Sequence, residues 1–293
     1  MKLTRENLDN LFAAVNVRLN KGLAKGWNDW TKFAMPVIST TSLEKYPMLL
    51  ATGAMREWIG ERIVNDSTGS MLTVRNRDFE KTEGVSRNDL EDDTFGYFAP
   101  LWEAIGVEAG NLWGRLATEA LTNPGNWADG AAFFGNRKIG KATINNAVSG
   151  ALTAGNYETA RARMLAFTDA DGKTPLGLTP NLLIVGPAQE AAAKRIFKTD
   201  LIVDGGSTMS NIHRDEVEIL VDPFLAGNAW FLACTDRGIM PVVVQKRREG
   251  TLQRWDNDAD ECVKTHNRCD YGIHSRGAAA AAVPALIIRG SGE

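Results

Sequence analysis

The chain has 293 residues, 44% of them hydrophobic, which is enough for a sizeable core in one large domain or two small ones. A net charge of −3 argues against tight nucleic-acid binding, which needs a basic face. Three cysteines without framework spacing and a charged N-terminus without a signal-peptide core indicate a reducing, intracellular compartment. No apolar run approaches the ~18 residues of a membrane span, so we expect no membrane partner.

The first predicted element is a helix that starts after Thr4, a good N-cap residue. Cationic residues and glycines at 21–26 end it. The helix has two possible roles: it belongs to the core, or it is an N-terminal arm that docks on another chain. In the second case its apolar stripe makes the contact, through Leu8, Leu11, Phe12 and Val15.

A strand is expected at 35–41, and residues 56–85 alternate apolar and charged side chains around a polar tip at 65–70. This pattern predicts a long hairpin. Two strands alone bury too little to be stable in water, so the hairpin needs a partner surface, and another copy of the chain is the simplest one. The alternative is that its charges only form a solvated face. The predicted contact residues are Arg56, Glu57, Trp58, Glu61, Arg62, Met71, Arg75, Arg77, Phe79, Lys81 and Glu83.

Residues 95–121 repeat large apolar side chains at helical spacing and predict a long helix, which Asn123-Pro124-Gly125 ends. Gly106, Gly110 and Gly114 recur on one face of it. Each costs about 1 kcal/mol of helix propensity relative to alanine, which is tolerable if another backbone packs closely there.

The remaining pattern intersperses helices and strands without a regular βαβ repeat, which favours an α+β fold. After a loop-rich stretch at 125–142, we expect a helix at 145–167, a buried strand at 181–187, a short helix at 188–197, strands at 217–221 and 229–234, a strand pair at 239–245 and 250–255 with which 262–273 could pair, and a closing apolar run at 278–288.

Three groups of residues suggest enzyme chemistry. Residues 135–142 nearly match a phosphate-binding loop, but Ala142 stands where a Ser or Thr would hold magnesium. Tetrahedral zinc is commonly bound by Cys and His side chains, and four of them lie close together in the sequence, at non-standard spacing: Cys262, His266, Cys269 and His274. His213 with Asp215 and Ser210 has the composition of a hydrolase triad and no nucleophile signature. None of these groups has the complete pattern of a known active site, so we expect no catalytic residues, no metal and no cofactor.

The hairpin-to-helix junction resembles a known family. Residues 56–62 (Arg-Glu-Trp-Ile-Gly-Glu-Arg), 88–93 (Asn-Asp-Leu-Glu-Asp-Asp) and 95–101 (Phe-Gly-Tyr-Phe-Ala-Pro-Leu) are similar to the major head subunits of Mu-like phages and prophages. Residues 7–12, Tyr271-Gly272 and Arg276 also resemble that family.

The resemblance implies the Hong Kong 97-type capsid fold. It would divide the chain into an N-terminal arm (1–35), an extended loop (55–85), a peripheral domain with the spine helix (36–54, 86–135 and 240–275) and an axial domain (136–239 and 276–293). Some relatives crosslink their subunits through a loop lysine, for which Lys81 is the candidate here, but the acid and asparagine partners are not evident, so we predict no such bond.

The implied function is a major capsid protein that forms the hexamers and pentamers of an icosahedral shell around double-stranded DNA. The implied partners are copies of itself, a scaffold protein, a protease, a portal and, weakly and non-specifically, the packaged DNA. The protein would occupy the host cytoplasm during assembly and the virion capsid afterwards. The alternatives are a nanocompartment shell of the same fold, a zinc- or nucleotide-dependent enzyme, and a soluble oligomeric binding module.

Overall fold

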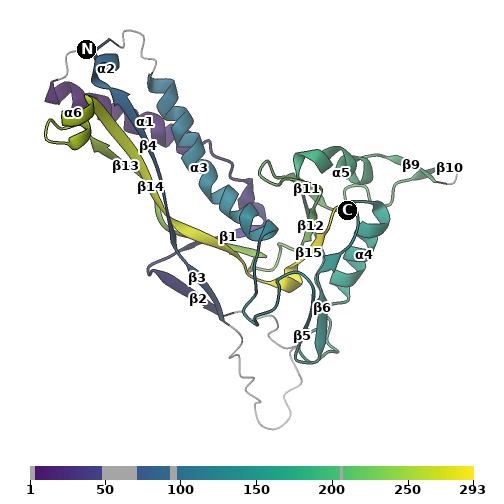
Figure 1. Ribbon diagram of the computed structural model, residues 1–293. Coiled ribbons are helices and arrows are strands. Elements are labelled where there is room, and N and C mark those ends of the chain that lie inside the picture. Colours follow the sequence, from purple (N-terminus) through teal and green to yellow (C-terminus); the bar gives the residue numbers. More distant parts are fainter. Residues whose placement is uncertain (1–3, 48–70, 93–97, 205–206) are drawn as a thin grey trace.

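The computed structural model describes residues 4–47, 71–92, 98–204 and 207–293. The described chain has an elongated half, with two long helices beside a long sheet, and a compact half that carries the C-terminus (Figure 1). Its α-helices are α1 (Arg5–Leu23), α2 (Arg87–Asp92), α3 (Phe98–Thr122), α4 (Ala154–Leu165), α5 (Glu190–Phe197) and α6 (Glu261–His266), and its 3-10 turns are η1 (Asp29–Lys32), η2 (Pro187–Gln189) and η3 (Pro284–Leu286). Helices and strands are interspersed, which confirms the α+β prediction.

A four-stranded sheet runs along the elongated half. Its strands lie in the order β1 (Ala34–Ile38), β13 (Val242–Trp255), β14 (Arg268–Ala281) and β4 (Arg77–Ser86), and only the β1–β13 pair is parallel. The separate strands predicted at 239–245 and 250–255 are in fact the single strand β13. Two register shifts between Lys246 and Thr251 accommodate the charged residues that suggest a turn.

α1 begins where the sequence predicts, because Thr4 caps it: its Oγ1 accepts a hydrogen bond from the backbone N–H of Asn7 at 3.3 Å. Val15 and Leu19 of α1 are buried, and with Trp102 and Tyr271 they belong to a separate apolar cluster. α1 is therefore part of the core of the elongated half, the first of its two predicted roles.

The glycines of α3 lie where the two helices touch. A Cβ at Gly106 would stand 2.3 Å from the backbone oxygen of Leu19, and one at Gly22 would stand 2.1 Å from that of Glu103. Further along, a Cβ at Gly110 would stand 3.1 Å from the Cα of Gly26. A second backbone thus approaches α3 at Gly106 and Gly110, as predicted, whereas Gly114 faces the side chains of Trp27 and Phe224.

A five-stranded sheet is the centre of the compact half. Its strand order is β11 (Glu218–Val221), β8 (Leu182–Val185), β12 (Trp230–Ala233), β15 (Ile287–Gly290) and β7 (Ala147–Val148). Every residue of β8 and β12 is buried, as the apolar runs predict. The main apolar core gathers around these strands and extends to the near ends of β13, β14 and α3.

The helix predicted at 145–167 begins later than expected. Its N-cap is Thr153, whose side chain accepts a hydrogen bond from the backbone N–H of Asn156, so α4 begins at Ala154. Residue 145 and residues 147–148 belong instead to strands β6 and β7, and Gly150, with φ +109°, lies in the bend before the helix.

Three two-stranded ribbons complete the described structure: β2 (Leu43–Pro47) with β3 (Met71–Arg75), β5 (Asn136–Ile139) with β6 (Ala142–Asn145), and β9 (Leu201–Asp204) with β10 (Ser207–Ser210). The first strand of the predicted hairpin, at 56–64, lies outside the described residues.

The returning strand of that hairpin, expected to run through 71–85, is divided at Asn76. β3 pairs with β2, while β4 joins β14 in the four-stranded sheet. The buried Asn76 side chain fixes this branch point, because its Nδ2 donates to Ser39 Oγ and to the Thr41 carbonyl oxygen, both at 2.8 Å.

Candidate functional site

The three enzyme hypotheses find no support in the geometry. Residues 135–142 form the β5–β6 hairpin, with Gly140 at its turn with φ +61°, whereas a phosphate-binding loop connects a strand to a helix. His213 does not complete a triad. Its Nδ1 lies 3.0 Å from Glu216 and its Nε2 2.9 Å from Glu158, while Asp215 pairs with Lys198 at 2.5 Å.

The four candidate zinc ligands do not converge. Cys269 is fully buried, and burial raises the pKa of its thiol to about 11, which disfavours the thiolate that a metal needs. His274 lies between Arg248 and Asp78, at 2.9 Å and 3.3 Å. Within the described ranges, no three His, Cys, Asp or Glu side chains are grouped so that they could hold a metal ion.

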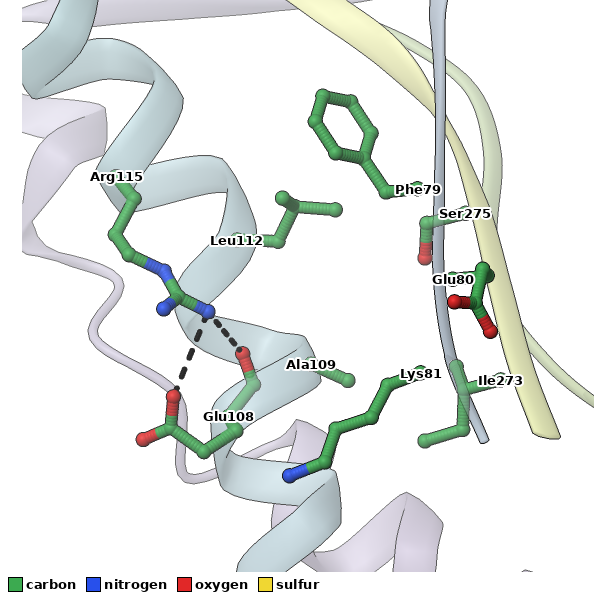
Figure 2. Close-up of a pocket in the computed structure, with 9 residues that line it drawn as sticks. All are labelled: Phe79, Glu80, Lys81, Glu108, Ala109, Leu112, Arg115, Ile273 and Ser275. Carbon is green, nitrogen blue, oxygen red and sulfur yellow. Dashed lines mark hydrogen bonds and ion pairs between the residues drawn. The ribbon is translucent and has the colours of Figure 1, made fainter. Parts of the chain in front are cut away.

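An open groove of about 400 Å³ lies between α3 and β4 (Figure 2). We call it the helix groove, and it is lined by Phe79, Glu80, Lys81, Glu108, Ala109, Leu112, Arg115, Ile273 and Ser275. Its floor is apolar, while charged side chains of both signs stand at its edges (Figure 2). Such a surface can take an apolar side chain of a partner and select that partner's register by charge.

The charged edges of the helix groove are partly neutralised within the chain. Arg115 Nη2 donates to the Glu108 carbonyl oxygen at 3.1 Å and lies 3.5 Å from its carboxylate. Lys81 Nζ lies 3.5 Å from Glu83. Both pairs are solvent-exposed, so a partner could exchange their bonds with little loss.

The β2–β3 ribbon has one packed face and one exposed face. Leu72 and Val74 are buried, while Met71, Thr73 and Arg75 are exposed. Side chains directly opposite on paired strands share a face, so Leu43 and Lys45 of β2 lie beside Arg75 and Thr73. The outer face therefore carries two apolar and two cationic side chains: Leu43, Met71, Lys45 and Arg75.

A buried glutamine attaches this ribbon to the four-stranded sheet. Gln245 of β13 donates through Nε2 to the Val74 carbonyl oxygen at 3.2 Å and to Asn76 Oδ1 at 2.7 Å. Its Oε1 accepts from the Tyr46 hydroxyl at 3.0 Å. Because Gln245 is fully buried, these bonds fix the base of the ribbon rigidly.

The predicted hairpin contact residues fall into three groups. Met71 and Arg75 lie on the exposed face of the ribbon, and Arg77, Phe79, Lys81 and Glu83 lie on β4. Arg77 is already engaged: it makes a two-bond contact with Glu119, at 2.8 and 3.3 Å, and lies 5.3 Å from the Phe79 ring. The remaining predicted contact residues form the third group and lie outside the described residues: Arg56, Glu57, Trp58, Glu61 and Arg62.

The predicted arm contacts are directed inward. Leu8 and Val15 are buried within the chain. Leu11 and Phe12 pack against the apolar cluster that contains Val15. In this arrangement the four side chains hold α1 to its own chain, so a contact of theirs with a neighbour stays a prediction.

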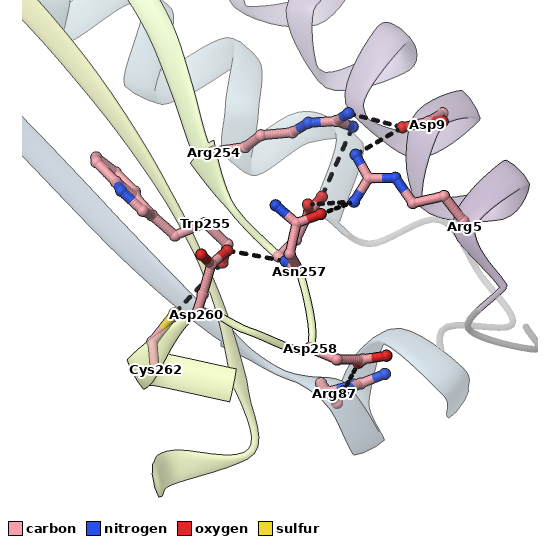
Figure 3. Close-up of polar contacts among 10 residues, drawn as sticks. Arg5, Asp9, Arg87, Arg254, Trp255, Asn257, Asp258, Asp260 and Cys262 are labelled. Atoms are coloured by element: carbon pink, nitrogen blue, oxygen red, sulfur yellow. Dashed lines mark hydrogen bonds and ion pairs between the residues drawn. The ribbon is translucent and has the colours of Figure 1, made fainter. Parts of the chain in front are cut away.

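Ionic contacts fasten the start of α1 to the end of β13 (Figure 3). Asp9 lies 3.0 Å from Arg5 and 2.7 Å from Arg254, and Arg5 lies 3.1 Å from the buried carboxylate of Asp256. The Arg254 hydrogen bond lowers the pKa of Asp9, with burial opposing it. These contacts connect the first turns of α1 to the sheet.

Two charged surfaces were missed by the sequence reasoning. Arg18, Lys21 and Lys25, here called the basic cluster, gather around Glu103 of α3, and the Lys25 and Lys21 hydrogen bonds lower the pKa of its carboxyl. A second open groove, of about 440 Å³, lies at the far end of the four-stranded sheet. We call it the distal groove, and its lining includes Trp255, Asp260, Glu261, Cys262, His266, Arg268 and Asp270.

These surfaces could not be found from local pattern, because each combines residues far apart in the chain. The basic cluster needs α1 against α3, and the distal groove needs β13 beside β14. The available signal was the spacing of the cations at positions 18, 21 and 25, of which Lys21 and Lys25 are interpreted above as ending the helix.

The described helices include none with the length and apolar character needed to cross a membrane.

Comparison with known proteins gives consistent matches over nearly the whole chain. The sequence profile of the family described as "Mu-like prophage major head subunit gpT" matches residues 8–146, 139–225 and 226–291. The chain is 26% identical over 276 residues to the "Mu-like prophage FluMu major head subunit" of Haemophilus influenzae, covering 94% of this chain and 70% of that protein. It is 23% identical over 308 residues to the "Major capsid protein" of Escherichia phage Mu, covering 77% of this chain and all of that protein (100%).

Solved structures share the fold. A chain of the bacteriophage JBD30 procapsid has a TM-score of 0.60 at 21% identity, covering 98% of this chain and 75% of its own length. A virus-like particle from Pyrococcus furiosus has a TM-score of 0.52 at 13% identity, covering 95% of this chain and 98% of its own length. At these identities the likeness concerns the fold alone.

Proposed function

This chain belongs to the Mu-like prophage major head subunit family, and from that premise we propose that its copies associate through the helix groove and the β2–β3 ribbon into a closed shell. As a member of the family it is a major capsid protein of the Mu-like kind, a structural protein rather than an enzyme. The observation that carries the function is the family match, which runs in chain order from residue 8 to residue 291.

The surfaces of the two elements support the proposed contact. The ribbon offers Leu43 and Met71 beside two cationic side chains, and the helix groove offers an apolar floor with the carboxylates of Glu80 and Glu108 at its edges. The ribbon and the groove are different patches of one chain. A contact between different patches closes into a ring when the rotation between copies allows it. Many such modest contacts sum to a stable shell by multivalency.

The wider assembly is also part of the proposal. The shell would consist of hexamers and pentamers around double-stranded DNA, with a scaffold protein, a protease and a portal taking part in the host cytoplasm. The compact half would be the main part of the axial domain, expected at 136–239 and 276–293, and would lie near the capsomer centre. The elongated half would be peripheral. The mild negative charge fits a shell that encloses DNA without binding it tightly.

A nanocompartment shell remains the second candidate. It rests only on the shared fold, and no observation on this chain favours it over the family function.

Electron microscopy of the purified chain, expressed with its scaffold, tests the proposal. Wild-type protein should form closed shells. Leu112→Arg in the helix groove and Met71→Asp on the ribbon should each leave a folded subunit and reduce the shell yield at least about tenfold, because each places a charge in an apolar contact.

Leu165→Arg is the matched control, since Leu165 is 38% exposed on α4, away from both surfaces. It should form shells at the wild-type yield. Shells of normal size and yield from both the groove and the ribbon variants would show that these surfaces are not the contact. Folded wild-type protein that never forms shells would contradict assembly itself.

A further inference from the structure

At its distal end the four-stranded sheet has one face packed against helices. There the Arg254 guanidinium lies 4.6 Å from the Phe12 ring of α1, and Tyr271 meets Trp102 of α3 with ring centroids 5.2 Å apart. Successive side chains on a strand point to opposite faces, so Trp255 lies on the other face of the sheet. Figure 3 shows Arg254 directed toward Asp9 and Trp255 directed away from it.

A glycine makes room for Trp255 on that face. A Cβ on Gly272 of the neighbouring strand would stand 2.9 Å from the Trp255 ring and 3.0 Å from Thr82 Oγ1. The indole can therefore lie against the sheet, and it remains 39% exposed as a wall of the distal groove. An exposed indole on an otherwise polar sheet face is a ready platform for stacking.

Carboxylates exceed cations around this platform. The lining residues include Asp260, Glu261 and Asp270 against the single guanidinium of Arg268. Asp270 and Arg268 neutralise each other through bonds of 2.6 and 2.9 Å. The groove thus combines an aromatic face with the negative charge of Asp260 and Glu261, which is the environment that attracts a lysine or arginine side chain.

The basic cluster has the complementary chemistry. Its side chains are 48% (Arg18), 53% (Lys21) and 55% (Lys25) exposed, and the three share the one carboxylate of Glu103. Val17, beside them on α1, is 68% exposed. Two of the three positive charges are therefore not neutralised by Glu103, and they lie next to an apolar side chain.

The two surfaces of one copy are too far apart to meet. Arg5 is bonded to Asp256, the residue after Trp255, so the start of α1 lies near the distal groove. Lys21 lies 16 residues further along the helix, which places it about 24 Å away at ~1.5 Å per residue. No side chain spans that distance, so contact between the two surfaces requires two copies.

We propose that the distal groove of one copy binds the basic cluster of a second copy, with a cationic side chain stacked on Trp255 and paired with Glu261 or Asp260. The inference rests on the proposed self-assembly and adds to it a second pair of complementary surfaces. Like the ribbon contact, it joins different patches of the chain and can repeat around a ring.

Zero-length crosslinking tests the contact directly. Full-length chains labelled with ¹⁴N and ¹⁵N are mixed, allowed to assemble and treated with a water-soluble carbodiimide, which couples a carboxylate to an amine only where the two touch. Mass spectrometry should find peptides that join Glu261 or Asp260 of one isotope to Lys21 or Lys25 of the other. Assembled protein without such mixed-isotope peptides would overturn the inference.

Charge exchange gives a second, independent readout. Glu261→Lys and Lys21→Glu should each lower the yield of closed shells about tenfold, because each places like charges together. The double variant Glu261→Lys/Lys21→Glu should recover most of the loss. Asp258→Lys is the control: its carboxylate is 90% exposed and lies outside the groove lining, so shell yield should not change.

The outcomes separate this inference from the proposed function. Shells that form normally in both single charge variants, or a double variant no better than the single ones, overturn the contact and leave self-assembly standing. If the wild-type protein gives mixed-isotope peptides but forms no closed shell, the contact is supported and the proposed assembly into a closed shell is contradicted.

Discussion

The strands of the five-stranded sheet are buried along their whole length in β8 and β12, whereas β4 of the four-stranded sheet is exposed at most of its positions. The compact half is stabilised by apolar side chains around a closed core. The elongated half depends on a smaller apolar cluster, on close backbone contact between α1 and α3, and on ionic contacts at its distal end. It is also the half that carries the helix groove, the distal groove and the basic cluster. The contacts that we propose between copies therefore all lie in the elongated half.

Truncation of a core side chain should have the largest effect, and it should fall on the compact half. Leu183→Ala in fully buried β8 should lower the free energy of unfolding by about 2–5 kcal/mol, because it leaves a cavity. Leu201→Ala is the control, since Leu201 is 60% exposed, and it should change little. Denaturant titration measures both. Equal effects would remove the contrast between buried and exposed strands.

Addition of a methyl group should destabilise the elongated half. Gly106→Ala places a carbon against the backbone of α1 and should cost about 1–3 kcal/mol. Gly155→Ala in α4 is the matched control: nothing lies within 4 Å of its added Cβ, so it should stabilise by about 0.5–1 kcal/mol. If both substitutions stabilise, the glycine contact between the helices is not tight.

Removal of one buried charge should lower the free energy of unfolding less than the two changes above, through weaker contacts at the distal end of the four-stranded sheet. Asp256→Asn weakens the bonds of a buried carboxylate to Arg5 and Arg254 and should cost about 1–2 kcal/mol. Asp258→Asn, which breaks the exposed pair with Arg87, should cost under about 0.5 kcal/mol. Hydrogen exchange at the start of α1 should quicken in the first variant only. An unchanged rate there would mean that apolar contacts alone hold α1.

The smallest effect concerns the base of the ribbon and depends on pH. Hydrogen bonds from the backbone N–H groups of Thr41 and Thr40 and from the Ser39 hydroxyl lower the pKa of Glu44 to about 2 from 4.5. A lowered pKa stabilises the folded form above pH 4.5, and this stabilisation is lost as the pH falls toward about 2. The Thr40 and Thr41 amide resonances should follow that titration by NMR, and Glu44→Gln should abolish it. A midpoint near 4.5 would mean that the carboxylate makes no such bonds.

Local patterns predict much of this structure. The Thr4 cap predicts α1, apolar spacing predicts α3, and the short apolar runs predict β8 and β12, because each signal lies within one element. Gly106 and Gly110 even indicate the close backbone neighbour. Once these elements form, the burial of their apolar side chains drives their packing.

What local pattern does not supply is pairing across the chain. Ala34 pairs with Val242 and Arg268 with Ser86, and no spacing within either segment indicates the partner. The division of 71–85 at Asn76 depends on Ser39 and Gln245 for the same reason. The helix groove and the distal groove result from such pairings, so their lining residues could be named only in part beforehand.

β13 and β14 each run for 14 residues, from the buried valines and alanines near the compact half to the groove at Trp255. At ~3.3 Å per residue this gives a stiff rod of about 46 Å. A tilt of about 5° at one end of such a rod displaces the other by roughly 4 Å, as much as a side-chain length. A small change in the orientation of one half therefore produces a larger displacement at the tip of the other.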